Sequence, residues 1–258
     1  MGEAIAITSG KGGVGKSSVC VNMGVVLSQL GNRVCLIDVD LGLKNLDVMM
    51  GLENRVIYDL MDVMEGRCML SQAMIKDKVQ EHLYLLPACK TVHIEQFHHE
   101  DLKVVVEQLI EQFDYVLLDT PAGIERGFVS SIACVNRVVV VTTLDVTALQ
   151  DADRVIGILM NEGMEHISFV VNRMNVKMME KGISVPLQEA KQWLAIDFLG
   201  YVFDDETMIR ANNFGKPVTL QRDTSLYSCF QAIVKRMIGE RATLPKIKER
   251  SFLAKIFG

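Results

Sequence analysis

One short motif constrains this 258-residue chain more than any other feature. Residues 10–17 read Gly-Lys-Gly-Gly-Val-Gly-Lys-Ser, which satisfies the pattern G-x-x-x-x-G-K-[ST]. An apolar segment precedes the motif and a helical pattern follows it, so we expect a strand, a phosphate-binding loop and a helix in succession. The glycines let backbone N–H groups wrap phosphate oxygens, and the helix N-terminus favours an anion. The alternative is an accidental glycine-rich turn, which the flanking strand and helix disfavour.

The residues of this loop fall into the roles that a nucleoside triphosphate requires. Lys16 is expected to reach the β- and γ-phosphates, and the hydroxyl of Ser17 to ligate Mg²⁺. Ser18 is placed to donate to the α-phosphate. The rest of the phosphate cradle would come from the backbone of Gly12, Gly13, Val14 and Gly15.

Short apolar runs alternate with longer helical patterns along most of the chain. The runs are continuous rather than alternating, which is typical of parallel strands covered on both faces. The expected strands are 4–8, 33–39, 83–86, 115–119, 137–143, 168–172 and 198–203. The expected helices are 16–30, 99–112, 147–162, 186–194 and 225–238. This order predicts an α/β fold of the P-loop NTPase type, with a doubly wound, mainly parallel sheet flanked by helices.

Three aspartates follow or end two of the predicted strands, where ligands bind in such sheets. Asp119 ends the run 115–119, the Walker B pattern, and is expected to hold Mg²⁺ through a water molecule. Asp38 and Asp40 stand two residues apart, so their side chains point alike if the strand continues. One of them could assist the metal while the other orients the attacking water. The alternatives are a helix N-cap for Asp119 and a solvated acidic loop for the other two.

The loop carries a second lysine, Lys11, at a position that ordinary phosphate loops leave free. The run 9–18 resembles the deviant Walker A motif of the ParA/MinD family, K-G-G-x-G-K-[ST]-[ST]. The resemblance covers nearly the whole chain, including the segments 38–47, 119–125 and 151–159. It implies an ATPase that uses ATP and Mg²⁺ and forms an ATP-dependent homodimer, in which Lys11 reaches the phosphates of the partner.

The resemblance also implies roles for individual residues. Asp40 would position the attacking water, Asp38 would support the Mg²⁺ shell, and Asn45 would lie beside the phosphates. Asn172, at the end of another apolar run, would bond the edge of adenine, and Asp205 would belong to a second loop on the base side. The predicted catalytic residues are therefore Lys11, Lys16 and Asp40, and the predicted metal ligands are Ser17, Asp38 and Asp119.

Charge is uneven along the chain. The net charge is −5, whereas residues 235–258 contain seven basic and two acidic side chains. On a helix, the final residues would gather Phe252, Leu253, Ile256 and Phe257 on one side and place Lys255 on the other. We expect a P-loop ATPase domain over 1–239, and over 240–258 a linker and an amphipathic helix that binds anionic membrane lipids. The alternative is a last helix docked on the core.

Composition indicates where such a protein works. The six cysteines are far apart with no C-x-x-C pair, which is typical of buried thiols in a reducing compartment. We recognise no signal peptide, and no apolar run approaches the roughly 18 residues of a membrane span. The expected location is cytoplasmic and peripheral, on the cytoplasmic face of the cell membrane.

Within the family, these features favour the branch that helps to place the division septum. Such a protein dimerises with ATP, binds the inner membrane through its C-terminal helix and recruits a division inhibitor of the MinC type, with a stimulating or topological factor as a further partner. A FlhG-type regulator of flagellar number and placement is the main alternative. A ParA-type partition ATPase is another, although the acidic body disfavours nucleic acid as a partner. Weaker alternatives are a nucleotide-gated adaptor and a metal site at His93, His98 and His99.

Overall fold

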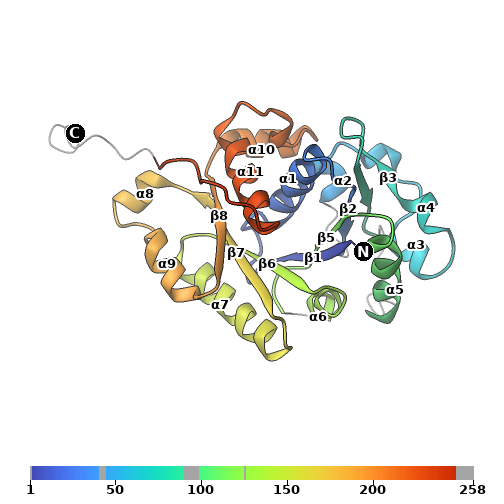
Figure 1. The fold of residues 1–258 in the computed structure, drawn as a ribbon, viewed down its shortest axis with the longest axis horizontal. Coiled ribbons are helices and arrows are strands. Elements are labelled where there is room, and N and C mark those ends of the chain that lie inside the picture. The colour runs from blue at the N-terminus through green and yellow to red at the C-terminus, as the bar shows by residue number, and fades with distance from the viewer. Residues whose placement is uncertain (1, 41–44, 90–98, 125, 248–258) are drawn as a thin grey trace.

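The computed structural model describes residues 2–40, 45–89, 99–124 and 126–247. Within these ranges the strands are β1 (Glu3–Thr8), β2 (Val34–Asp38), β3 (Ile75–Lys76), β4 (Leu83–Leu86), β5 (Tyr115–Asp119), β6 (Arg137–Thr142), β7 (His166–Met174) and β8 (Asp197–Phe203). They form one sheet in the order β3-β4-β2-β5-β1-β6-β7-β8 (Figure 1). Every neighbouring pair is parallel except β3 with β4. The predicted doubly wound, mainly parallel sheet is therefore confirmed.

The register of the central strands places the functional loops together. Strand β1 lies between β5 and β6, and Ile7 of β1 is opposite Asp119 of β5. Asp38, the last residue of β2, is opposite the same Asp119. Because ligands bind beyond the carboxyl ends of strands at such crossing points, the loops after β1, β2 and β5 share one crevice.

Helices cover both faces of the sheet. They are α1 (Lys16–Gln29), α2 (Leu46–Met49), α3 (Leu60–Met64), α4 (Leu70–Ala73), α5 (His99–Ile110), α6 (Arg126–Ile132), α7 (Val146–Asn161), α8 (Val176–Glu180), α9 (Leu187–Leu194), α10 (Glu206–Asn213) and α11 (Ser225–Met237), with 3-10 turns η1 (Glu53–Arg55) and η3 (Val218–Leu220). Helices α1, α2, α10 and α11 pack on one face, and α5, α6, α7 and α9 lie on the other (Figure 1).

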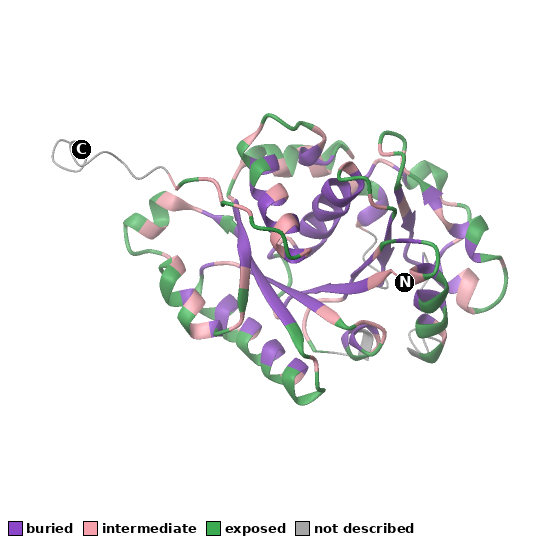
Figure 2. Cartoon of the chain, in the orientation of Figure 1, coloured by how far each residue is buried: buried purple, intermediate pink, exposed green. Residues whose placement is uncertain are grey.

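Helix α1 is the most deeply buried helix in the described part of the chain. Residues from Lys16 to Ser28 are buried without interruption, because α11 and α2 cover the side that faces away from β2 and β5 (Figure 2). A helix that is apolar all round belongs in a core. The helix that follows the phosphate loop is therefore anchored on all sides.

The expected strands and helices are all present, with ends that differ by at most two residues. The sequence reasoning missed β3 and the short helices α2, α3, α4, α6, α8 and α10. Except for α10, which is as long as α9, these elements span too few residues for a periodic apolar pattern to develop.

Residues 241–247 continue from α11 and cross the outermost strand β8 (Figure 1). The hydroxyl of Tyr201 donates to the carbonyl of Pro245. Leu244 lies over Gly200, where an added Cβ would come within 2.7 Å of its Cδ2 atom. Leu244 and Ile247 both pack against the core. The described part of the predicted linker is therefore held on the sheet.

The predicted membrane helix lies outside the described residues, as do Phe252, Leu253, Lys255, Ile256 and Phe257. The predicted division into 1–239 and 240–258 therefore stays a prediction. The helices that the structure describes include none that is both long enough and apolar enough to span a bilayer.

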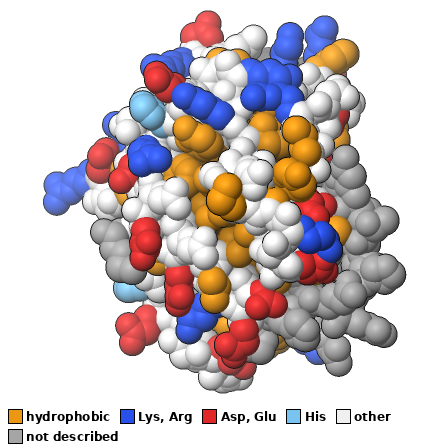
Figure 3. Space-filling view, turned by 90° about the vertical axis from the view of Figure 1, so that its right-hand side faces the viewer, with side chains coloured by type: hydrophobic (Ala, Val, Ile, Leu, Met, Phe, Trp, Pro, Cys, Tyr) orange, Lys and Arg blue, Asp and Glu red, His pale blue; other side chains and the backbone are white. Residues whose placement is uncertain are grey.

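The end of the sheet at β3 carries exposed hydrophobic side chains. The described residues end near β8, whereas β3, α3 and α4 form the opposite end of the molecule (Figure 1). Viewed from that opposite end, hydrophobic side chains gather in the middle of the face, with lysine and arginine side chains above them (Figure 3). The exposed side chains of Ile57, Met69 and Val79 belong to segments around these elements.

Candidate active site

The phosphate loop ends at Gly15, the residue immediately before helix α1. This residue has a φ of +91°, in the left-handed region that favours glycine. An added Cβ would also lie 2.3 Å from Nδ2 of Asn172, on β7. That Nδ2 donates to the carbonyl of Val14 at 2.8 Å. The last glycine of the motif is therefore required both by its backbone conformation and by the close approach of β7.

A buried ion pair lies at the start of α1. Nζ of Lys16 is 2.5 Å from Oδ1 of Asp119, and the two residues are 6% and 0% exposed. The side chain of Ser17 also hydrogen-bonds to Asp119. Burial raises the pKa of Asp119, and the charge of Lys16 opposes that rise. The structure thus brings the loop lysine, the loop serine and the Walker B aspartate together.

Asp38 is the second buried carboxyl of the site. Its oxygens accept backbone N–H bonds from Asp40 at 3.2 Å, from Asn45 at 3.2 Å and from Leu46 at 3.3 Å. Burial raises the pKa of Asp38 to about 7, and the charge of Asp119 adds to the rise, while the three hydrogen bonds oppose it. Two carboxyl groups that disfavour each other's ionisation suit a site that accepts a cation.

The oxygen atoms present fit Mg²⁺. In the described part of the chain, Oδ2 of Asp119 is buried and has no hydrogen-bond partner. Ser17 supplies a hydroxyl next to this carboxylate, and Asp38, opposite Asp119 on β2, supplies a second carboxyl. Such hard oxygen donors are what Mg²⁺ prefers. Ser17, Asp38 and Asp119 therefore remain the residues that we predict to hold the ion.

Asp40 and Asn45 flank residues 41–44, which are not described. Asp40 is half-buried, and burial raises its pKa, while the charge of Lys16 lowers it. Asp40 therefore lies within electrostatic reach of the loop lysine, where a water-positioning group belongs. Asn45 contributes its backbone N–H to Asp38 and immediately precedes α2. Both roles stay predictions.

The turn after Asp119 is tied to the phosphate loop. The N–H of Gly123 donates to the carbonyl of Ser9 at 2.9 Å, and the hydroxyl of Thr120 donates to the carbonyl of Ile7 at 3.2 Å. A change at the loop therefore reaches this turn through direct hydrogen bonds, which suits a sensor of the γ-phosphate.

Lys11 lies apart from the buried pair. Its Nζ donates to Oγ1 of Thr147 at 2.8 Å and is 3.6 Å from Oδ1 of Asp145. Asp145 is the N-cap of α7 and accepts from the N–H of Ala148. Burial alone would raise the pKa of Asp145, but hydrogen bonds from Thr143, Thr147 and Ala148 and the charge of Lys11 lower it to about 2. In the single chain, the additional lysine is therefore bound to its own α7.

We predict that Asp145→Asn lowers the protein concentration at which ATP produces a dimer. Asparagine still caps α7, because Asn and Asp are comparable N-cap residues, but it no longer attracts Lys11. Exposed ion pairs contribute about 1 kcal/mol or less, so a shift of about two- to fivefold is expected. Sedimentation of the variant with ATP measures this shift. Thr143→Val, which leaves the charge in place, serves as a control, and an unchanged midpoint for Asp145→Asn contradicts the prediction.

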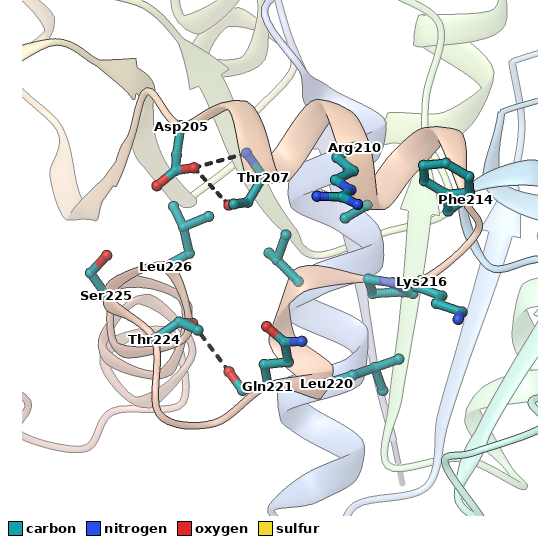
Figure 4. Close-up of a pocket in the computed structure, with 13 residues that line it drawn as sticks. Asp205, Thr207, Arg210, Phe214, Lys216, Leu220, Gln221, Thr224, Ser225 and Leu226 are labelled. Carbon is teal, nitrogen blue, oxygen red and sulfur yellow. Dashed lines mark hydrogen bonds between the residues drawn. The ribbon is translucent and has the colours of Figure 1, made fainter.

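A cavity of about 720 Å³ lies between α10, η3 and the start of α11 (Figure 4). Asp205 stands on its rim, where the carboxylate caps α10 by accepting from the N–H and hydroxyl of Thr207 at 2.8 and 2.7 Å. Arg210 of α10 and Phe214, which directly follows that helix, line the cavity (Figure 4). Asn172 is not among its lining residues, since it lies under the phosphate loop. The segments that carry these two residues are adjacent, since Met174 of β7 pairs with Phe203 of β8, so their roles on the base side stay predictions.

Sequence reasoning missed the polar contacts that join this cavity to the phosphate loop. Asn22 of α1 is fully buried, and its Oδ1 accepts from the N–H and hydroxyl of Thr219 at 3.1 and 2.8 Å. Asn212 of α10 donates to the hydroxyl oxygen of Ser18 at 2.7 Å. An asparagine within the apolar pattern of α1 was a visible signal for the first contact. Nothing local to Asn212 indicates the second.

A phosphate loop after the central strand, with its lysine paired to a buried carboxylate, defines a P-loop NTPase. The ParA family model, described as NUBPL iron-transfer P-loop NTPase, matches residues 1–238. The chain is 45% identical to the septum site-determining protein MinD of Bacillus subtilis, over 99% of this chain and 97% of that protein. The chain belongs to the ParA/MinD family, and it is an ATPase that uses ATP and Mg²⁺.

Two solved structures support the same placement. The MinC:MinD cell division protein complex of Aquifex aeolicus contains a chain with a TM-score of 0.89 and 35% identity, covering 95% of this chain and 100% of that one. The septum site-determining protein MinD of Pyrococcus horikoshii, complexed with Mg-ADP, has a TM-score of 0.84 and 26% identity, covering 93% and 97%.

Proposed function

We propose that this chain is a membrane-associated ATPase switch that helps to place the division septum. ATP drives two copies together, the dimer binds the inner membrane through the basic tail, and the bound dimer recruits a division inhibitor of the MinC type. The observation that carries the proposal is the identity over almost the full length with a septum site-determining protein. The Aquifex relative, whose structure is a complex with MinC, supports the choice of partner.

The buried pair is the first contact that ATP must change. Lys16 exchanges Asp119 for the β- and γ-phosphates, while the N–H groups around Gly12–Gly15 and the hydroxyl of Ser18 hold the other phosphate oxygens. Mg²⁺, when bound, neutralises charge on the phosphates. Asp119, released from Lys16, then stands free to hold the ion with Ser17.

Dimerisation follows from the position of Lys11. The side chain of Lys11 is exposed and bonds to Thr147 and Asp145. It can therefore move away from these partners towards another chain without disturbing the buried pair of Lys16 and Asp119. A partner's phosphates, which carry several negative charges, are a stronger attraction than one exposed carboxylate. This fold therefore allows Lys11 to bind the partner's phosphates across the dimer.

The base and ribose of ATP occupy the cavity beside Asp205. A volume of about 720 Å³ is within the usual range for small-molecule sites. The cavity adjoins the α-phosphate position, because α10 contacts Ser18 directly. Arg210 and Phe214 offer a planar cation and a ring for stacking against a base.

We predict that Asp40→Ala slows hydrolysis by about 10²- to 10⁴-fold and leaves ATP binding nearly unchanged. Water positioning acts in the transition state, so its loss lowers turnover more than ground-state affinity. The variant should elute as an ATP-bound dimer in size-exclusion runs. Asp197→Ala, an exposed aspartate at the start of β8, is the matched control. Hydrolysis at the native rate, or a variant that stays monomeric with ATP, contradicts the role.

The same variant tests the cellular function. Asp40→Ala protein is loaded with ATP on liposomes of anionic lipid and used to capture partners from an extract. Recovery of a division inhibitor supports the proposal. Flagellar assembly components would favour the FlhG-type alternative, and retention on DNA rather than liposomes would favour a ParA-type partition role.

A further inference from the structure

The hydroxyl of Ser18 has one hydrogen-bond partner within the chain. Nδ2 of Asn212, in the last turn of α10, donates to Oγ of Ser18 at 2.7 Å. Ser18 is 6% exposed, so little water competes for this bond. A serine hydroxyl can accept through two lone pairs and donate one proton. Because the amide uses an acceptor position, the proton of Ser18 is left to donate elsewhere.

We propose that Asn212 is a positioning residue for the nucleotide, in that it orients the hydroxyl of Ser18 so that its proton points to the α-phosphate. The proposal rests on the ATP site described above, in which Ser18 is the donor to that phosphate. Asn212 does not touch ATP itself. It acts through Ser18, and its loss affects affinity only while Ser18 is present.

The placement of Asn212 on α10 gives the contact a second consequence. Thr207, Arg210 and Ala211 of the same helix line the cavity proposed for the base. The opposite wall, η3, is bound to α1 through Thr219 and Asn22. Both walls are therefore hydrogen-bonded to the helix that carries the phosphate loop. The bond from Asn212 holds the α10 wall of the cavity against the start of α1.

The two contacts differ in a way that an experiment can use. Asn22 and Thr219 are fully buried and bond only to protein groups, so their loss is expected to lower stability. Asn212 is half-buried and bonds to a side chain that is predicted to contact ATP. A positioning role for Asn212 therefore predicts a coupling to Ser18 in nucleotide affinity.

The test is a double-mutant cycle measured by titration calorimetry with ATP and with ADP. A neutral hydrogen bond contributes about 0.5–1.5 kcal/mol, so Asn212→Ala should weaken both affinities by about 3- to 10-fold. In the Ser18→Ala background, Asn212→Ala should have an effect of less than about twofold, because the group it orients is gone. Equal effects in both backgrounds would overturn the proposal, since they indicate a structural role.

Asn212→Asp has the same shape as the native side chain and tests the direction of the bond. A carboxylate only accepts hydrogen bonds, so the hydroxyl of Ser18 would donate to it rather than to the phosphate. Its negative charge would also repel the phosphate, and affinity should fall further than in Asn212→Ala. Asn213→Asp makes the same change of charge on the exposed neighbouring residue and should alter affinity by less than about twofold. Native affinity in Asn212→Asp overturns the proposal. Absence of ATP and ADP binding in the unmodified chain would overturn the ATP site itself.

Discussion

Lys16→Ala should show no detectable ATP binding by calorimetry. The lysine would contact two phosphates, and each hydrogen bond to a charged group contributes about 1.5–3 kcal/mol. Its removal should therefore weaken binding by on the order of 10²-fold or more. The loss of affinity should be equally large when ATP is bound but not hydrolysed, since the lysine contacts the phosphates in the ground state. ATP affinity within about threefold of the native value contradicts the assignment of the phosphate loop.

The same substitution should also change how stability depends on pH. It leaves Asp119 buried without its partner, which costs about 3–5 kcal/mol when the carboxylate is charged. Burial then raises the pKa of Asp119 further above its usual 3.8, so the neutral form is favoured in the folded chain. Stability is retained below pH 3.8 and lost as pH rises through the raised pKa, so the deficit should be larger at pH 8 than at pH 5.

A second substitution separates these two effects. Asp119→Asn in the Lys16→Ala background removes the unpaired charge, so it should restore stability and remove most of the additional pH dependence. ATP binding should stay absent in this double variant. Thermal unfolding at pH 5 and pH 8 measures the first effect, and calorimetry measures the second. A double variant that is no more stable than Lys16→Ala at pH 8 contradicts the view that the buried pair is the cause.

Phe257→Glu should release the ATP-bound protein from anionic liposomes. Each of the four apolar tail residues can contribute up to about 1.5–3 kcal/mol if fully buried in lipid, less the cost of ordering a helix. Basic residues near the surface add about 1 kcal/mol each. One tail is therefore near the limit of useful affinity, and two tails on a dimer should bind far more tightly. Losing one large apolar group in each tail should lower pelleting to background.

Ser251→Glu is the matched control, because at about 100° per residue it adds the same charge on the side of the helix opposite Phe257 and its apolar neighbours. It should reduce binding only moderately, through electrostatic repulsion. Deletion of residues 252–258 should remove binding altogether while leaving nucleotide affinity unchanged. Liposome sedimentation with ATP, with ADP and without nucleotide measures all four proteins. Equal pelleting in the three states would refute an ATP-controlled switch.

Those parts of the site that depend on local sequence could be predicted. The phosphate loop is encoded in eight consecutive residues, and the strand that ends at Asp119 is a continuous apolar run, so both were visible in the sequence. Asp38 was placed correctly for the same reason, since it ends an apolar run in a sheet whose parallel order was predictable. Parallel strands bring their carboxyl ends to one edge, and that rule alone joins Asp38 to Asp119.

Contacts between distant parts of the chain could not be predicted. Ser18 and Asn212 are separated by 194 positions, and Lys11 and Thr147 by 136. Each contact joins a loop or a helix end to another element. Its geometry depends on the positions in which the helices pack on the sheet. The bond from Asn172 to the carbonyl of Val14 is another such contact, joining residues 158 positions apart.

If the tail binds lipid as proposed above, residues 241–247, which lie across β8, set which end of the domain is nearest to the bilayer. Since Leu244 and Ile247 are packed on the core, a lipid-bound tail draws the β8 end of the sheet towards the surface. The β3 end of the sheet is then the end of the molecule farthest from the attached tail (Figure 1). The exposed side chains of Ile57, Met69 and Val79 belong to that end, so they stay accessible to a partner while the tail is on lipid.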